Sequence, residues 1–100
     1  MRLETLDENS YILHGKLKEL EDYFELKRLL LKHKEKQQKE INFYIPTARE
    51  INFYILGLFL KLARYDGFSF SFSLGSLNLY ESFLRLGLHS FFKVAYEDLE

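Results

Sequence analysis

The three histidines of the chain, His14, His33 and His89, are the side chains best suited to general acid–base catalysis or metal binding. They lie far apart in the sequence, and none has the serine or carboxylate neighbours that are typical of a catalytic triad or a metal site. We therefore expect all three to be solvated, with His14 on the polar side of a strand, His33 among lysines and His89 in a loop. The pattern predicts no catalytic residue, no metal ligand and no enzyme activity.

Other site chemistry is restricted by residue types that the sequence lacks. It has no cysteine, which excludes disulfides, thiolate catalysis and cysteine metal sites. Its five glycines are isolated from one another, so no glycine-rich loop is available to hold a phosphate, and we expect no cofactor. The basic stretch from Lys32 to Lys39 contains Glu35 and is interpreted as a solvated helix end.

The composition is that of one folded domain spanning residues 1–100, with 47% hydrophobic and 29% charged residues. A net charge of −1 creates no overall field for nucleic acid, so no nucleic-acid partner is expected. The most apolar run, Ile51 to Ala63, is too short to cross a bilayer and contains Lys61. Residues 1–5 lack the pattern of a signal peptide. We expect a cytoplasmic protein without direct membrane insertion.

Hydrophobic periodicity predicts alternating strands and helices. Phe68–Ser73 alternates strictly between phenylalanine and serine, which is the clearest strand signal in the chain. The expected elements, in order, are a short strand around Leu3 and Thr5, a strand at Tyr11–Leu17, a helix at Glu19–Gln38, a strand at Glu40–Ile45, a helix at Ile51–Tyr65, a strand at Phe68–Ser73, a helix at Leu77–Leu86 and a strand at Phe91–Tyr96.

This order predicts an α/β fold with a mostly parallel sheet of four to five strands, because strands that alternate with helices are joined by right-handed crossovers. Strands covered on both faces read as continuous apolar runs. The middle strands here alternate phenylalanine or isoleucine with serine, asparagine and tyrosine. We therefore expect the helices to lie mainly on one face of the sheet.

One hexapeptide, Glu-Ile-Asn-Phe-Tyr-Ile, occurs twice, at Glu40–Ile45 and at Glu50–Ile55. The two copies could form a β-hairpin around Pro46–Arg49. We favour a strand followed by a helix, because the second copy continues into Leu56–Arg64, which is long and rich in helix-forming residues.

Four segments, in this order and spacing, resemble those of a known family. Tyr11–Leu17 is similar to its second strand, Ile41–Ile45 to its central strand, Leu56–Ala63 to its Leu-Gly-Leu-rich helix, and Leu86–Val94 to its late Gly-Leu-x-x-Leu-Phe-x-Val segment. The chain resembles, over nearly its whole length, a STAS domain, as found in anti-sigma-factor antagonists and in the cytoplasmic tails of sulfate transporters. The resemblance implies a STAS-like βα superhelix that binds other proteins.

The resemblance also implies that this chain lacks the phosphorylation site of regulatory family members. Regulatory STAS domains carry a phosphorylated Ser or Thr where the second long helix begins. The matching positions here are Asn52, Phe53, Tyr54 and Ile55, with Tyr54 at the family phosphosite. The two acidic residues that the family places after its second strand fall on Lys16 and Lys18. A phosphate would add about two negative charges at this helix start. The resemblance therefore implies a degenerate STAS domain without conventional phosphoregulation.

The start of this helix is the candidate site. Almost every residue from Ile51 to Leu60 is apolar, whereas a surface helix needs a polar outer face. We expect Phe53 or Tyr54, together with Leu56 and Leu60, to lack cover within the chain. The alternative is that the flanking helices bury this helix nearly all round. The residues expected to bind a partner are Lys16, Lys18, Phe53, Tyr54 and Leu56.

Three functions follow from these observations, in decreasing order of support. The first is a non-enzymatic adaptor like an anti-sigma-factor antagonist, binding an anti-sigma factor, a kinase-like protein or a second copy of itself. The second is a small cytoplasmic STAS subunit of a lipid-export ABC transporter, seated on the ATPase. The third is a ligand-binding domain or enzyme that uses the polar sheet face around His14, Asn42, Tyr44 and Ser71.

Overall fold

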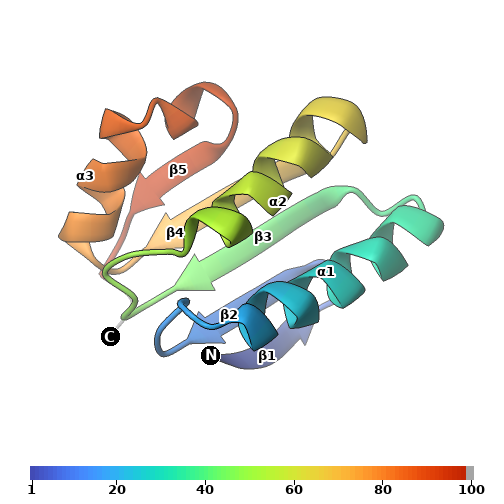
Figure 1. Ribbon diagram of the computed structural model, residues 1–100, viewed down its shortest axis with the longest axis horizontal. Helices are drawn as coiled ribbons and strands as arrows, with labels where there is room; N and C mark the ends of the chain where they lie inside the picture. The colour runs from blue at the N-terminus through green and yellow to red at the C-terminus, as the bar shows by residue number, and fades with distance from the viewer. Residues whose placement is uncertain (99–100) are drawn as a thin grey trace.

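The structure is a computed structural model that describes residues 1–98 (Figure 1). Its elements, in chain order, are β1 (Arg2–Asp7), β2 (Ser10–His14), α1 (Leu20–Glu35), β3 (Glu40–Ile45), α2 (Phe53–Tyr65), β4 (Ser69–Leu74), α3 (Leu77–Arg85), the short 3₁₀ helix η1 (Leu88–Ser90) and β5 (Lys93–Tyr96). The predicted alternation of strands and helices is thereby confirmed; the element ends differ, and η1 was not predicted.

The five strands form one sheet whose spatial order, β1-β2-β3-β4-β5, is also their order in the sequence. β1 and β2 pair antiparallel, and the other three pairs are parallel. The prediction of an α/β fold with a mostly parallel sheet of four to five strands is therefore correct. Each parallel strand is reached through a helix, as right-handed crossovers require.

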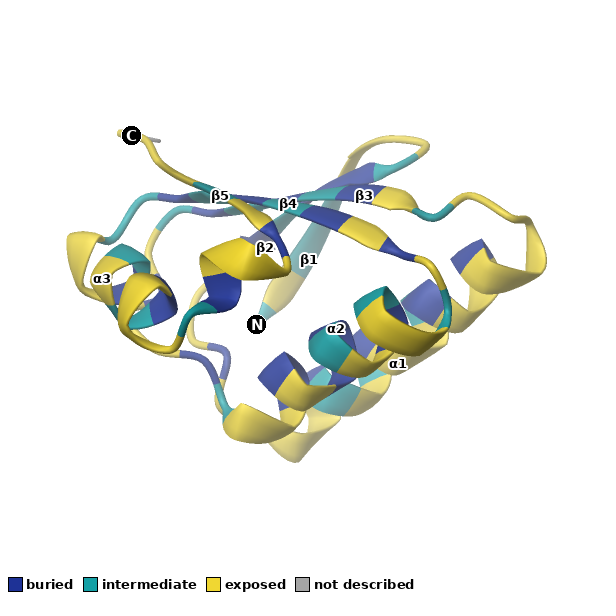
Figure 2. Ribbon diagram, turned by 90° about the horizontal axis from the view of Figure 1, so that it is seen from above, coloured by how far each residue is buried: buried dark blue, intermediate teal, exposed yellow. Residues whose placement is uncertain are grey.

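All three helices lie on the same side of the sheet, as Figure 2 shows. The strand side chains alternate accordingly. Ile41, Phe43 and Ile45 of β3 are buried beneath the helices, whereas Asn42 and Tyr44 are only partly covered. A polar open face and an apolar covered face are what the alternation of the sequence predicts.

Aromatic rings fix α2 onto the sheet. The Phe59 ring of α2 lies 5.3 Å from Phe43 of β3, 5.1 Å from Phe70 and 5.2 Å from Phe72 of β4, measured between centroids. All four side chains are at most 1% exposed. Burying one such side chain stabilises a fold by about 1.5–3 kcal/mol. The packing of Phe59 therefore fixes how far α2 lies from the sheet and which of its faces turns towards the sheet. It thereby also positions the residues that begin the helix.

The two copies of the repeated hexapeptide adopt different structures. The first copy is β3, the central strand. In the second copy Ile51 forms an isolated parallel bridge with Leu17, Asn52 caps a helix, and Phe53 starts α2. The predicted strand followed by a helix is thus confirmed, and the two copies form no hairpin with each other.

Two elements end earlier than their hydrophobic patterns predict. β2 stops at His14 instead of Leu17, because Gly15 has a φ of 83° and turns the chain out of the extended conformation. α1 stops at Glu35, and Gln37 then adopts a left-handed φ of 61°. Both departures depend on backbone angles, which hydrophobic periodicity does not report.

Candidate functional site

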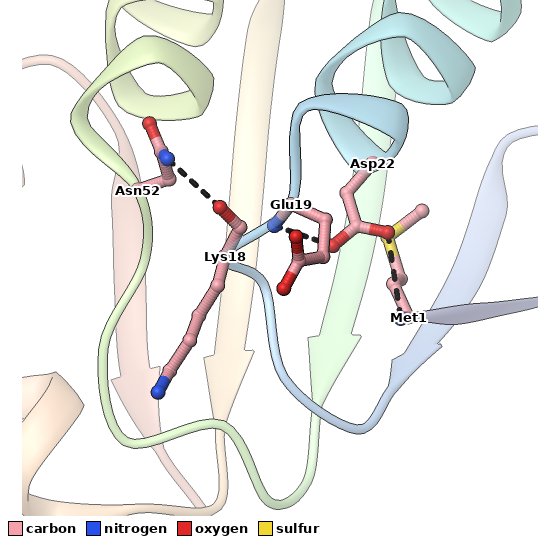
Figure 3. A network of polar contacts seen from close by, with 5 residues as sticks. All are labelled: Met1, Lys18, Glu19, Asp22 and Asn52. Atoms are coloured by element: carbon pink, nitrogen blue, oxygen red, sulfur yellow. Dashed lines mark hydrogen bonds and ion pairs between the residues drawn. The ribbon is translucent and has the colours of Figure 1, made fainter.

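The start of α2 is held in place by one side chain, Asn52. Its Oδ1 accepts a hydrogen bond from the Tyr54 backbone N–H at 2.7 Å, which caps the helix. Its Nδ2 donates to the Lys18 carbonyl at 2.9 Å (Figure 3), and its backbone N–H donates to the Leu17 carbonyl, also at 2.9 Å. The loop between β2 and α1 is therefore fastened to the first turn of α2.

The other end of that loop is fixed by the buried carboxylate of Asp22. Its Oδ2 accepts from the Glu19 backbone N–H at 3.1 Å, and its Oδ1 pairs with the Met1 amino group at 3.4 Å (Figure 3). Asp22 is 5% exposed. Sequence analysis did not single out this residue, although an acidic residue in the first turn of a helix is a recognisable capping signal.

Phe53 and Tyr54 are the most exposed apolar residues of the candidate site. Their side chains are 77% and 70% exposed, whereas Ile55 and Leu56, the next two residues, are buried. The expectation that Leu56 lacks cover is therefore wrong, because it is 6% exposed and belongs to the core cluster. Leu60 is partly buried.

A cleft of about 810 Å³ lies beside these rings, between α2 and α3. We call it the α2/α3 cleft. Phe53 and Leu56 line it from α2, Phe83 lines it from α3, and Leu86 lines it just after the end of α3. Lys18 and Glu50 are its charged lining residues. Four of the five predicted partner-binding residues, Lys18, Phe53, Tyr54 and Leu56, thus meet at one surface. Lys16 is exposed but does not line the cleft.

A second groove, of about 490 Å³, runs on the other side of Tyr54, between α1 and α2. We call it the α1/α2 groove. Lys27 and Leu31 of α1 and Lys61 of α2 are among its lining residues. Gly57 also lines it, and a Cβ added at Gly57 would meet no atom within 4 Å. Sequence analysis missed this groove; the signal was a glycine in the middle of a helix of strong helix formers.

The polar sheet face does not gather the residues named for a ligand site. A cavity of about 420 Å³ has Asn42 and Ser71 in its lining, together with residues 89–93, which run from η1 to the first residue of β5. His14 and Tyr44 are not among its lining residues. His14 instead contacts Glu4 at 2.8 Å between Nε2 and Oε1, and it is only partly exposed.

His33 is buried, which contradicts the prediction that it is a solvated histidine among lysines. It is 5% exposed, and it follows Leu26 and Leu30 on the buried stripe of α1. Its Nδ1 donates to the Gln38 carbonyl at 3.1 Å, and its Nε2 is hydrogen-bonded to the Tyr11 hydroxyl. The spacing of three and four along the helix was the signal that could have placed it.

Burial shifts the titration of both partners in this contact. The pKa of His33 is lowered, mainly because burial disfavours the charged imidazolium, and the positive charge of Lys36 lowers it further. The hydrogen bond to Gln38 acts in the opposite direction. The pKa of the Tyr11 phenol is raised, chiefly by burial and then by the Asp7 carboxylate. We interpret the pair as a structural contact of the core.

Residues 1–98 contain neither a metal-binding cluster nor a membrane-spanning helix. No three His, Asp or Glu side chains in this range gather so that they could bind a metal ion. None of its helices combines the length and apolarity needed to cross a membrane.

Comparison with known proteins found no match: no protein-family model fits this chain, and no curated protein or solved structure is similar to it. The likeness to STAS domains therefore rests on the four sequence segments described above.

Proposed function

We propose that this chain is a non-enzymatic protein-binding module of STAS type that docks a partner at the start of α2. One observation carries the proposal: the consecutive side chains Phe53 and Tyr54 are 77% and 70% exposed at the beginning of a helix that is otherwise packed onto the sheet. Exposed apolar patches mark interaction surfaces, and large aromatic residues are common anchors in them.

The surroundings of the two rings suit this role. Leu86, which directly follows α3, is 53% exposed and lines the α2/α3 cleft together with Phe53. Binding two or three such side chains, at about 1.5–3 kcal/mol each, would supply a useful part of the free energy of a complex. Lys18 adds a positive charge to the same surface.

The proposed binding is constitutive. Tyr54 occupies the position that corresponds to the phosphorylated Ser or Thr of regulatory STAS domains, and Lys16 and Lys18 stand where those domains have acidic residues. A module of this kind would act in the cytoplasm on an anti-sigma factor, a kinase-like protein or a second copy of itself, without a phosphate switch at this position.

The test is an affinity capture from the source cell with three forms of the protein. Phe53→Asp places a charge in the proposed interface, and Phe91→Asp makes the same kind of change at a ring that is 54% exposed outside the candidate site. We expect the wild type and Phe91→Asp to retain a specific partner that Phe53→Asp loses. An equal yield from all three forms, or a monomer that retains nothing, would refute the proposal.

The identity of the captured protein distinguishes the two STAS roles. An anti-sigma factor or kinase-like protein supports the regulatory role. Recovery of a transporter ATPase would instead assign the chain as a small transporter subunit.

A further inference from the structure

We infer that the α1/α2 groove binds an amphipathic helix with acidic flanks, carried by the partner protein. This inference rests on the proposed function and adds to it the shape and charge of the partner. It concerns a surface that adjoins the α2/α3 cleft, and Phe53 and Tyr54 line both.

The groove has the size of a helix-binding site. Its walls are α1 and α2, which lie side by side over the sheet (Figure 1). On α1 its lining extends from Tyr23 to Lys34, which at the rise of an α-helix corresponds to about 17 Å, or about three turns. Three turns accommodate apolar anchors at the i, i+3 or i+4, and i+7 positions of an incoming helix.

The backbone of the groove favours a helix over an extended peptide. An extended peptide binds by adding hydrogen bonds to the free edge of a sheet, and both walls here are helices whose backbone groups bond within the helix. The absence of a side chain at Gly57 leaves a hollow between the two walls. A ridge of side chains from a third helix can enter this hollow, as helices pack ridge into groove.

Exposed apolar groups along the groove provide contacts for such a ridge. Leu31 of α1 is 43% exposed, and Tyr65 at the end of α2 is 72% exposed. Tyr54 stands at the opposite end of the same wall of the groove. The apolar contacts therefore run along the whole length of the groove.

The charge of the groove indicates which residues should lie on either side of the apolar face of a bound helix. Lys27 lies on the α1 wall and Lys61 on the α2 wall, and within residues 1–98 neither forms an ion pair. Lys34, at the far end, is paired with Asp66 at 3.0 Å. The α2/α3 cleft, by comparison, carries one lysine and one glutamate. Of these two surfaces, the α1/α2 groove is the one with an excess of positive charge. Acidic residues on both flanks of a bound helix would match this charge.

The test selects peptides from a displayed library with leucines fixed at helical spacing and random residues between them. We expect glutamate and aspartate to be enriched at the flanks of peptides that bind the purified protein. Affinity of the best peptide, measured by fluorescence anisotropy, should fall with rising salt. Enrichment of basic or uncharged flanks would overturn the inference.

Two kinds of variant locate the binding. Gly57→Phe fills the hollow, and the double change Lys27→Glu with Lys61→Glu reverses the charge of the walls. Each should weaken binding of the acidic peptide by about tenfold or more. Lys93→Glu, at the start of β5, reverses a charge outside the groove and should leave affinity unchanged. Circular dichroism verifies that every variant is folded. Unchanged affinity in folded Gly57→Phe and in the folded double variant would also overturn the inference.

The inference and the proposed function fail separately. The capture experiment is repeated with Gly57→Phe beside Phe53→Asp. If Phe53→Asp loses the partner and Gly57→Phe retains it, the groove inference is wrong and the proposed function stands. If both variants lose it, both claims are supported. If both retain it, the proposed function is wrong, and the inference that rests on it is wrong as well.

Discussion

The side-chain amide of Asn52 donates a hydrogen bond to the backbone carbonyl of Lys18 at 2.9 Å, joining two loops that are far apart in the sequence. The same side chain caps α2 through the Tyr54 N–H. The candidate interaction surface thus depends on one residue that contributes both a donor and an acceptor. Variants of this residue can separate the two roles.

Asn52→Ala should lower the free energy of unfolding by about 1–2 kcal/mol, because it removes a helix cap and a hydrogen bond between loops. Asn52→Asp is the matched control. It keeps the oxygen that accepts from Tyr54 but cannot donate to Lys18, so its loss should be smaller. Urea unfolding followed by circular dichroism measures both. Equal losses in the two variants would show that capping contributes nothing at this position.

Phe53→Ala and Phe59→Ala should differ strongly although both shorten a phenylalanine of α2. Phe53 is 77% exposed, so its truncation should change stability by less than about 0.5 kcal/mol. Phe59 is fully buried among the rings of β3 and β4, and its truncation should cost about 3–5 kcal/mol. Chemical denaturation of the two variants gives the comparison. A large loss for Phe53→Ala would mean that its ring stabilises the fold itself.

Two glycines should respond to alanine in opposite directions. At Gly57 an added Cβ meets nothing within 4 Å in the middle of α2, so Gly57→Ala should stabilise the protein by about 0.5–1 kcal/mol. At Gly75 the added Cβ would clash with the Pro46 carbonyl oxygen, so Gly75→Ala should destabilise the protein. Thermal unfolding shows the sign of each change. Lower stability in Gly57→Ala would reveal a close neighbour in the groove.

Acid should weaken the fold through His33. Its Nδ1–H donates to the Gln38 carbonyl, so the neutral ring accepts at Nε2 from Tyr11. Protonation of Nε2 would turn the Tyr11 hydroxyl towards its other neighbour, the Glu8 carbonyl at 3.5 Å, which is too distant for a good hydrogen bond. The charged form also suffers from burial and from the nearby Lys36.

The sign of the pH dependence follows from the lowered pKa of folded His33. The unfolded chain binds a proton near the ordinary pKa of about 6.5, and the folded chain binds it only at lower pH. This contribution to stability is therefore complete above about pH 6.5 and is lost as the pH falls below it. Urea unfolding from about pH 7 to pH 5 should show the loss. His33→Gln should flatten the slope, whereas His89→Gln, at an exposed position, should not. Identical slopes in all three proteins would contradict the assignment.

Much of the fold could be predicted because hydrophobic patterns report which side chains face the core. The alternation of Phe70 and Phe72 with serines placed β4 correctly. The continuation of the second hexapeptide into Leu56–Arg64 identified α2. Patterns are less informative about the strand that was expected to begin at Phe91. It begins at Lys93, because Leu88–Ser90 first forms a 3₁₀ turn.

The candidate site was predicted in part, because hydrophobic patterns also indicate where a helix has more apolar residues than the core can cover. Phe53 or Tyr54, with Leu56 and Leu60, was expected to lack cover because too many apolar residues open α2; both rings are exposed, and Leu60 is partly buried. Their neighbour Leu56 was misplaced, because it is buried in the core cluster, and the burial of a residue in a nearly all-apolar run depends on how the helix is rotated on the sheet. The burial of His33 was missed because its charged neighbours in sequence were weighed above its place on the helix. The α1/α2 groove depends on how two helices sit beside each other, which neither helix encodes alone.

The repeated hexapeptide shows that a local side-chain pattern does not by itself decide a structure. Both copies have the same six residues, yet the first is the strand β3 and the second contains the start of α2. The conformation of each copy therefore depends on its surroundings in the chain: Pro46 follows the first copy, and the helix-forming run that begins at Leu56 follows the second.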